Sequence, residues 1–192
     1  MKTFLLDTST NFLVFGYSGD GKTFVSKTID SLGKHKNILI DEIKKFFTEI
    51  KVTPNDIDKM IVGVGPGRYT GIRVGVTFAK TFAYSTKCLL YSFPSLDLLK
   101  TKDFKEGKNF CYSNAKKTAY FYKSFDVKGG VIVKETPEDI LDIESFDKLA
   151  GNKMTITGDF SFSDISKIKL TKVSDLFSFA PNYLKKGFDL DV

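Results

Sequence analysis

The sequence predicts an α/β fold, because three strand-like segments come first and a helix, a strand and a second helix follow them. Segments 2–7, 12–17 and 23–29 are short and rich in apolar or β-branched residues, and polar or glycine-containing turns separate them. We expect these segments to form an antiparallel meander. The chain has 192 residues, of which 42% are hydrophobic, so it is long enough for one domain or two small lobes around a buried core.

Two amphipathic helices and a buried strand are predicted after the meander. The first helix is predicted over 37–51, since its apolar side chains recur on one face. These side chains are Leu39, Ile43, Phe46, Phe47 and Ile50. A buried strand over 59–64 leads into a glycine-rich turn, and the second helix is predicted over 70–85. A strand over 88–92 and a short helix that begins at Pro94 follow, and the first lobe is predicted to span 1–95.

The second lobe, 96–192, is predicted to be smaller and built mainly of strands. Strands are expected over 109–114, 118–125, 131–135 and 154–157. Segment 137–149 is expected to be partly helical, the Gly158-Asp159 turn closes the last strand, and a helix is expected to start within 180–186. The meander followed by helix, strand and helix is typical of one half of an actin-like or sugar-kinase-like ATPase. The sequence thus predicts that α/β fold, with a complete first lobe and a reduced second lobe.

Composition argues against several classes of function. The only histidine is His35, and Cys88 and Cys111 lie far apart, so we predict no metal site and no serine–histidine hydrolysis in this chain. No apolar run reaches the roughly 18 residues of a membrane span, and the N-terminal apolar run is too short for a signal peptide. We therefore expect a cytoplasmic protein that does not bind a membrane. The net charge of +6 suits an acidic partner such as RNA, but the lysines are scattered.

Residues 16–23, Gly-Tyr-Ser-Gly-Asp-Gly-Lys-Thr, match the phosphate-loop pattern G-x-x-x-x-G-K-[ST]. That loop needs a helix after it, so that the helix N-terminal amides can hold the phosphates. Segment 23–29 is mostly β-branched and aromatic instead, and Gly-Asp-Gly is a frequent hairpin turn. We expect a hairpin here. A nucleotide-hydrolysing or kinase-like enzyme of the actin-like or P-loop class remains an alternative.

The segment 62–75 is unusual, because it places five glycines and a proline between a strand and a helix. It holds Arg68 and Arg73, the only arginines of the chain, and arginine binds carboxylates and phosphates at two points. In the following helix, small residues recur every four positions, at Gly71, Gly75, Ala79 and Ala83. This stripe allows another helix to approach closely, either within the chain or from a partner.

Several of these segments resemble the TsaB family. Residues 5–10, Leu-Leu-Asp-Thr-Ser-Thr, resemble the family's opening, and residues 65–75 are similar to its G-P-G-S-F-T-G-L-R-I-G signature, with Arg68 in place of the usual serine. His35 stands where the family often has a histidine. Weaker similarities occur at residues 112–116, 156–159 and 181–185. The match is strong over about 1–95 and patchy afterwards, and the chain is short for the family.

The resemblance implies an actin-like ATPase fold that has lost catalysis, so no catalytic residues are expected in this chain. It implies pairing with a TsaD-type catalytic subunit, which transfers a threonylcarbamoyl group to adenosine 37 of tRNA. It also implies that a TsaE-type ATPase joins the larger complex and that tRNA is contacted mainly through that complex. The chain alone is expected to form a homodimer. Pairing is expected through the two first-lobe helices. The implied interface residues are Leu39, Ile43, Phe46, Phe47, Gly71, Gly75, Phe78, Ala79, Phe82 and Ala83.

A possible site for an anion or nucleotide lies beside the turn after segment 2–7 and the glycine-rich segment 62–75. The residues placed there are Asp7, Gly65, Gly67, Arg68, Thr70 and Arg73. Ser9 stands where actin-like ATPases have a glycine, so the phosphate cradle should be weakened. Asp7 is read either as a residue that bonds the turn or as a remnant metal ligand. No cofactor is expected for this chain alone, and ATP or ADP at a subunit junction stays open.

Overall fold

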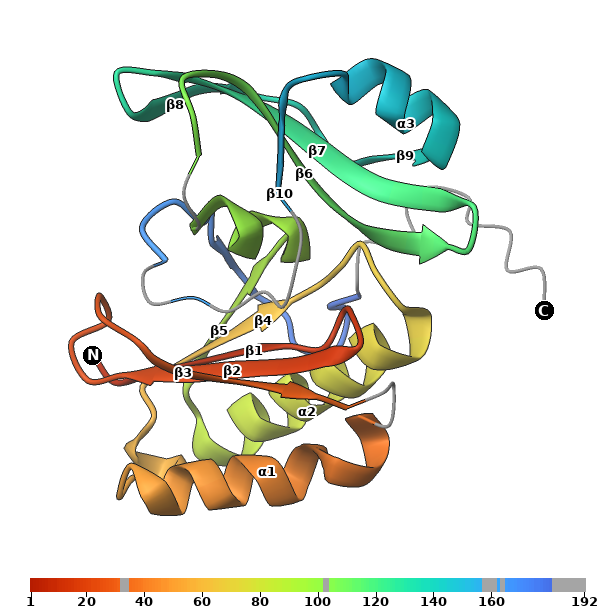
Figure 1. The fold of residues 1–192 in the computed structure, drawn as a ribbon. Helices are drawn as coiled ribbons and strands as arrows, with labels where there is room; N and C mark the ends of the chain where they lie inside the picture. The colour runs from red at the N-terminus through yellow and green to blue at the C-terminus, as the bar shows by residue number, and fades with distance from the viewer. Residues whose placement is uncertain (32–34, 102–103, 157–161, 163–164, 181–192) are drawn as a thin grey trace.

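The computed structural model describes residues 1–31, 35–101, 104–156, 162 and 165–180, which form two sheets stacked through a shared apolar layer (Figure 1). The first sheet has the order β11-β5-β4-β1-β2-β3. Its strands are β1 (Thr3–Asp7), β2 (Phe12–Ser18), β3 (Val25–Asp30), β4 (Lys59–Gly63), β5 (Leu89–Phe93) and β11 (Thr171–Lys172). Strands β1, β2 and β3 pair antiparallel, whereas β1, β4 and β5 run parallel. The predicted meander and the strands that follow it are confirmed.

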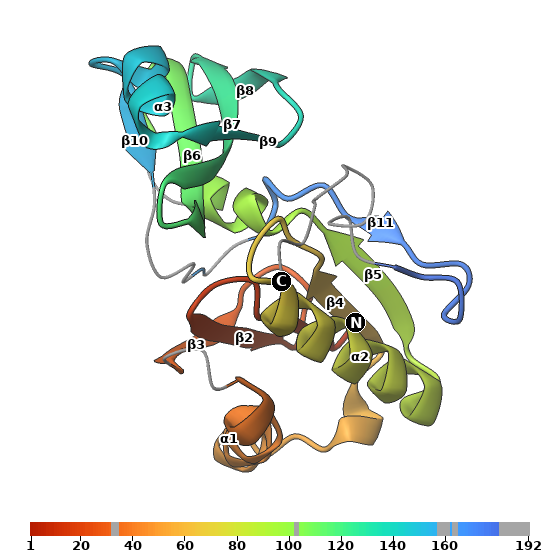
Figure 2. The ribbon, with the colours of Figure 1, turned by 90° about the vertical axis from the view of Figure 1, so that its right-hand side faces the viewer.

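Two helices cover one face of the first sheet, α1 (His35–Glu49) and α2 (Tyr69–Thr86), and they lie side by side (Figure 2). The short helix η1 (Pro54–Asp56) connects α1 to β4. All five residues of β1 are buried, as expected of a strand covered on both faces. Phe4, for example, packs edge-to-face on Phe47 of α1, with ring centroids 4.9 Å apart. Both helices begin and end within two residues of the predicted bounds.

The second sheet has the order β10-β6-β7-β8, and β9 also pairs with β7. Its strands are β6 (Gly107–Lys116), β7 (Ala119–Lys128), β8 (Val131–Glu135), β9 (Asp139–Asp142) and β10 (Met154–Ile156). Helix α3 (Ile143–Ala150) covers its outer face, where Phe146 packs among tyrosines (Figure 1). The segment 137–149 is therefore a strand followed by a helix. Asp142 ends the strand and accepts a hydrogen bond from the Ser145 N–H as the N-cap of α3.

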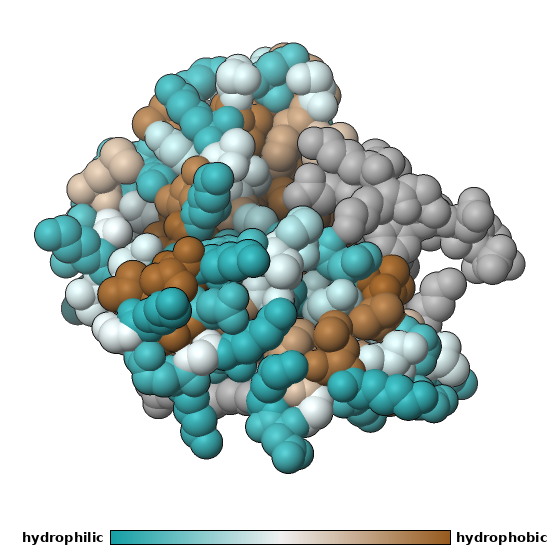
Figure 3. Space-filling view, turned by 90° about the horizontal axis from the view of Figure 1, so that it is seen from above, coloured by the Kyte–Doolittle hydropathy of each residue, from teal (hydrophilic) through white to brown (hydrophobic). Residues whose placement is uncertain are grey.

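Helix η2 (Ser95–Thr101) lies between the two sheets and joins them through leucines. Leu96, Leu98 and Leu99 are fully buried between Ile61 of the first sheet and Phe125 of the second. Seen from the side of the second sheet, apolar patches (brown) alternate with hydrophilic ones (teal) over the surface (Figure 3). Within the described residues, no helix is long and apolar enough to cross a membrane.

The chain returns to the first sheet after the second sheet is complete. Thr171 and Lys172 pair antiparallel with Ser92 and Tyr91 of β5. Strand β11 and the apolar Val173, Leu176 and Phe179 thus pack with the first sheet, although they lie within the predicted second lobe, 96–192. A two-residue strand carries too little pattern to be predicted from the sequence. The Gly158-Asp159 turn and the helix start within 181–186 lie outside the described residues, and the described Ala180 is exposed.

Candidate functional site

The turn after β1 is held by hydrogen bonds to Asp7, whose side chain is fully buried. One carboxylate oxygen accepts from the Ser9 backbone N–H at 2.9 Å and from the Ser9 hydroxyl at 2.6 Å. The other accepts from the Ser95 hydroxyl at 2.5 Å. That hydroxyl also accepts from the Gly65 N–H, so Asp7 connects β1, the glycine-rich turn and η2. This geometry matches the reading of Asp7 as a residue that bonds the turn.

The glycine-rich turn approaches the same place from β4. A Cβ on Gly67 would lie well within 3.0 Å of the Ser9 carbonyl, which also accepts the Arg68 N–H at 2.6 Å. Gly65 has a φ of +91°, where an L side chain would be strained. The structure thus brings three of the predicted anion-contacting residues, Asp7, Gly65 and Gly67, into one compact turn whose main hydrogen-bonding groups bind each other.

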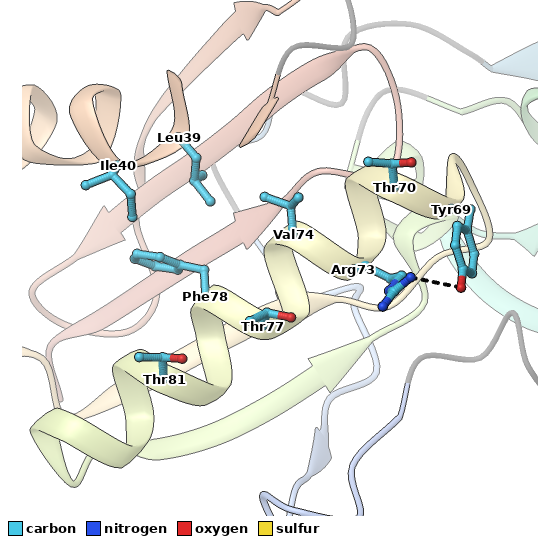
Figure 4. Close-up of a pocket in the computed structure, with 9 residues that line it drawn as sticks. All are labelled: Leu39, Ile40, Tyr69, Thr70, Arg73, Val74, Thr77, Phe78 and Thr81. Atoms are coloured by element: carbon cyan, nitrogen blue, oxygen red, sulfur yellow. Dashed lines mark hydrogen bonds between the residues drawn. The ribbon is translucent and has the colours of Figure 1, made fainter. Parts of the chain in front are cut away.

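The other predicted anion-contacting residues point elsewhere. The Arg68 guanidinium donates to the Asn11 side-chain oxygen. Thr70 and Arg73 are exposed, and Arg73 donates to the Tyr69 hydroxyl at 3.1 Å (Figure 4). The two arginines therefore do not converge on one site.

The small-residue stripe of α2 faces the interior of the chain. A Cβ on Gly75 would lie well within 3.0 Å of the Thr8 hydroxyl, and that hydroxyl donates to the Gly71 carbonyl at 2.7 Å. Ala79 and Ala83 are buried in the core below the sheet. Of the two readings left open by the sequence, close packing within the chain is the one that the geometry fits.

Most of the other predicted interface residues are also internal. Leu39, Ile43, Phe46, Phe47 and Phe82 are at most 9% exposed and belong to the core that α1 and α2 form with the sheet. Ile43, Phe46, Phe47 and Phe82 are therefore core residues of the folded chain, whereas Leu39 also reaches the groove between the two helices. The helical periodicity detected the inner face of each helix, since that face carries the regular apolar pattern. Only Phe78 of the predicted set is half-buried.

An open groove of about 500 Å³ lies on the outer side of the same two helices (Figure 4). Its lining residues are Leu39, Ile40, Tyr69, Thr70, Arg73, Val74, Thr77, Phe78 and Thr81. Ile40 is 47% exposed, and Val74 and Phe78 are half-buried, so the groove offers a largely apolar surface. Of these lining residues, the sets predicted from the sequence lacked Ile40, Tyr69, Val74, Thr77 and Thr81. The spacing 73, 77 and 81 along α2 was the available signal for the exposed face.

The residues that match a phosphate loop form a hairpin between β2 and β3, as expected. The Asp20 carboxylate accepts hydrogen bonds from the Lys22 and Thr23 amides at 2.8 and 3.0 Å and from the Ser18 hydroxyl. These bonds, the Lys22 N–H first, lower the pKa of Asp20 to about 2. In a phosphate loop these amides would face the phosphates. The alternative of a P-loop nucleotide-hydrolysing enzyme that uses residues 16–23 is therefore wrong.

A buried ionic cluster joins η2 to the second sheet. Asp97 lies 2.8 Å from the Lys123 ammonium and 3.1 Å from the Lys100 ammonium, and Glu135 lies 2.9 Å from both lysines. Burial alone would lower the pKa of Lys123, but the charges and hydrogen bonds of Asp97 and Glu135 more than offset it and raise that pKa. No sequence signal pointed to this cluster, because its members lie far apart along the chain.

Comparisons with known proteins place these features in a family. Residues 30–186 match a family model described as TsaD, tRNA N6-adenosine threonylcarbamoyltransferase. The chain is 33% identical over 78 residues to the tRNA threonylcarbamoyladenosine biosynthesis protein TsaB of Bacillus subtilis, a match that covers 40% of this chain and 34% of that protein. It is 24% identical over 113 residues to the TsaB of Buchnera aphidicola subsp. Acyrthosiphon pisum, covering 57% and 51%. The chain thus spans about a third to a half of these relatives.

Among solved structures, YeaZ of Pseudomonas aeruginosa superposes with a TM-score of 0.65 at 18% identity, covering 73% of this chain and 67% of that one. The likeness confirms the predicted α/β fold. The Bacillus and Buchnera relatives confirm the resemblance to TsaB-type proteins that residues 5–10 and 65–75 indicate.

Proposed function

We propose that this chain, which belongs to the TsaD family, is a non-catalytic partner subunit required for threonylcarbamoyl transfer to adenosine 37 of tRNA. It acts by pairing with the TsaD-type catalytic subunit through the outer side of α1 and α2. The observation that carries the proposal is the apolar groove between these helices, since exposed apolar surface of this kind marks interaction sites. The choice of reaction follows from its TsaB relatives, which are described as tRNA threonylcarbamoyladenosine biosynthesis proteins.

The non-catalytic part of the proposal is supported by the turn after β1. Both carboxylate oxygens of Asp7 accept hydrogen bonds from Ser9 or Ser95, and the Ser9 amide is bound to Asp7. A phosphate would have to displace these buried bonds, each of which contributes about 1 kcal/mol or more. The chain therefore contributes structure to the complex, and the chemistry belongs to the TsaD-type subunit.

The remaining partners follow from the same proposal. A TsaE-type ATPase joins the larger complex, tRNA is contacted mainly through that complex, and the chain alone forms a homodimer through the same face. Any ATP or ADP is bound at a subunit junction and not by this chain alone.

The first experiment measures the mass in solution of the chain alone and mixed with the TsaD-type protein of the same cell. We expect a mixed complex that Ile40→Glu weakens at least about tenfold, because a charge enters the apolar groove. Val133→Glu is the matched control, since Val133 is 55% exposed on β8, away from these helices. If the chain does not bind the TsaD-type protein, the proposal is contradicted. If both variants lose affinity equally, the location of the interface on α1 and α2 is contradicted.

The enzymatic alternative is tested by ATP turnover. We expect no turnover above background in the chain alone and no change in Lys22→Ala, because Lys22 lies on an exposed hairpin turn. Turnover that disappears in this variant would restore the alternative.

A further inference from the structure

Two lysines stand beside Tyr91 on the face of the first sheet that is opposite to α1 and α2. Strands β4, β5 and β11 are neighbours at one side of this sheet (Figure 2). Lys172 of β11 lies directly opposite Tyr91 of β5, so both side chains project from one face. Lys59 lies two residues before Ile61, which pairs with Tyr91, so it projects from that face too. Tyr91 and Ile61 pack in the apolar layer between the two sheets, which the helices do not share.

Lys59 is half-buried without a counterion. Its ammonium lies 4.4 Å from the centroid of the Tyr91 ring, and burial lowers its pKa. Lysines are seldom taken out of water unless a carboxylate pairs with them. Within the described ranges Lys59 forms no salt bridge, and the neighbouring Asp58 accepts the backbone N–H of Lys2 at 2.7 Å instead. The ring offsets part of the lost hydration, but the positive charge of Lys59 is not neutralised.

Lys172 adds a second positive charge on the other side of Tyr91. It is exposed, and it forms no salt bridge with any residue that the structure describes. Strands β4 and β11 lie on either side of β5, two strand spacings or about 10 Å apart. Lysine stems are long and flexible, so both ammonium groups can reach one anion placed above Tyr91. The arrangement therefore suits an anion that is contacted from two sides.

The position of the two lysines leaves them accessible in the proposed complex. The TsaD-type subunit is proposed to cover the outer side of α1 and α2, whereas the lysines lie on the opposite face of the sheet (Figure 2). The chain has a net charge of +6, and its TsaB relatives are described as tRNA threonylcarbamoyladenosine biosynthesis proteins. The nucleic-acid backbone supplies phosphate anions that lysine side chains bind. These observations favour RNA as the source of the anion.

We propose that Lys59 and Lys172 bind a phosphate of the tRNA backbone while tRNA is held by the complex of this chain with the TsaD-type subunit. The inference rests on the proposed function and adds a direct contact between this chain and the substrate of the complex. Backbone phosphates carry no sequence information, so the contact strengthens the binding of different tRNAs equally. Tyr91 is a positioning residue, because its ring holds the Lys59 ammonium on this face.

The test measures the affinity of the mixed complex for tRNA by fluorescence anisotropy over about 0.05–0.2 M salt. The double variant Lys59→Gln, Lys172→Gln should weaken binding on the order of tenfold at the low end of this range. It should also make the slope of log K against log salt shallower by about 2, one for each phosphate-binding lysine. The double variant Lys59→Arg, Lys172→Arg keeps both charges and should bind tRNA as the wild type does.

The matched control removes two positive charges elsewhere. Lys128 is exposed at the end of β7, and Lys148 of α3 is paired with Glu144, so both lie in the second sheet and its helix. The double variant Lys128→Gln, Lys148→Gln should keep the affinity for tRNA within about twofold of the wild type and leave the salt slope unchanged. Gel filtration of every variant with the TsaD-type subunit checks that the mixed complex still forms.

Each contrary outcome has a distinct meaning. A wild-type chain that does not bind the TsaD-type subunit refutes the proposed function. A mixed complex that binds tRNA equally well with and without Lys59 and Lys172 refutes only this inference. An equal loss of tRNA affinity in the control variant refutes the location, because the effect then follows from net charge alone. If the glutamine variant no longer binds the TsaD-type subunit, the two lysines contact an acidic protein surface, and the inference is refuted as well.

Discussion

Replacing Gly75 by alanine should destabilise the chain, although alanine is the better helix former. The added methyl would lie well within 3.0 Å of the Thr8 hydroxyl oxygen. Thr8 is 1% exposed and donates a hydrogen bond to the Gly71 carbonyl at 2.7 Å, so it cannot move without losing that bond. The close approach of α2 to the turn after β1 therefore depends on the missing side chain.

The magnitude follows from three opposing effects. Overpacking of a buried position costs about 1–3 kcal/mol, and the lost hydrogen bond costs about 1 kcal/mol. Removing a glycine from a helix interior returns about 1 kcal/mol. The net loss is about 1–3 kcal/mol, which for a chain of this size lowers Tm by about 2–12 °C.

The assay is thermal and urea unfolding, followed by circular dichroism, of Gly75→Ala, Thr8→Ala and the double variant. In the Thr8→Ala background the hydroxyl is absent, so Gly75→Ala should be neutral or slightly stabilising. The coupling energy should then be about 2 kcal/mol. Additive effects would refute the close packing. A Gly75→Ala chain that is as stable as the wild type but no longer binds its partner would show that the glycine faces the partner.

Three further predictions concern titratable groups. The folded-state pKa of Asp20 is about 2, below its ordinary value. The ionised carboxylate therefore contributes its full stabilisation above about pH 4 and loses it as the pH falls towards 2. The difference in Tm between the wild type and Asp20→Ala should shrink over that range. Asp97→Asn should lower the free energy of unfolding, measured by urea denaturation, by about 3 kcal/mol, because it removes one of the two carboxylates that contact the fully buried Lys100. A loss below about 1 kcal/mol would contradict this. Burial raises the pKa of Cys111 to about 12 and also raises that of the half-buried Cys88, so a thiol reagent should modify Cys88 first and Cys111 only on unfolding; equal rates would contradict the burial of Cys111.

The regular elements of the first lobe could be predicted because their patterns are local. The alternation of apolar strands and amphipathic helices gave β1 to β5, α1 and α2 to within about two residues, which is the usual uncertainty of helix ends. The hairpin at residues 16–23 could also be predicted, since the β-branched segment that follows it disfavours the helix of a phosphate loop.

The surface of the site was harder to predict than the fold. Helix α2 is apolar on more than one side, and periodicity does not say which side meets the sheet. The predicted interface was therefore mostly the inner face, including Phe82 and Ala83, whereas the groove uses Arg73 and Thr77. Contacts between distant segments, such as those of Asp97 with Lys123, leave no local pattern at all.

The antiparallel pairing of β11 with β5 has a consequence for synthesis on the ribosome. Residues 171 and 172 complete the first sheet, but they emerge only after the whole second sheet has been made. Until then the outer edge of β5 exposes unpaired backbone N–H and C=O groups, next to the exposed Leu89. The nascent chain thus carries an open strand edge while residues 94–170 are made, and protection from intermolecular pairing during that interval has to come from chaperones or from rapid closure of the last strand.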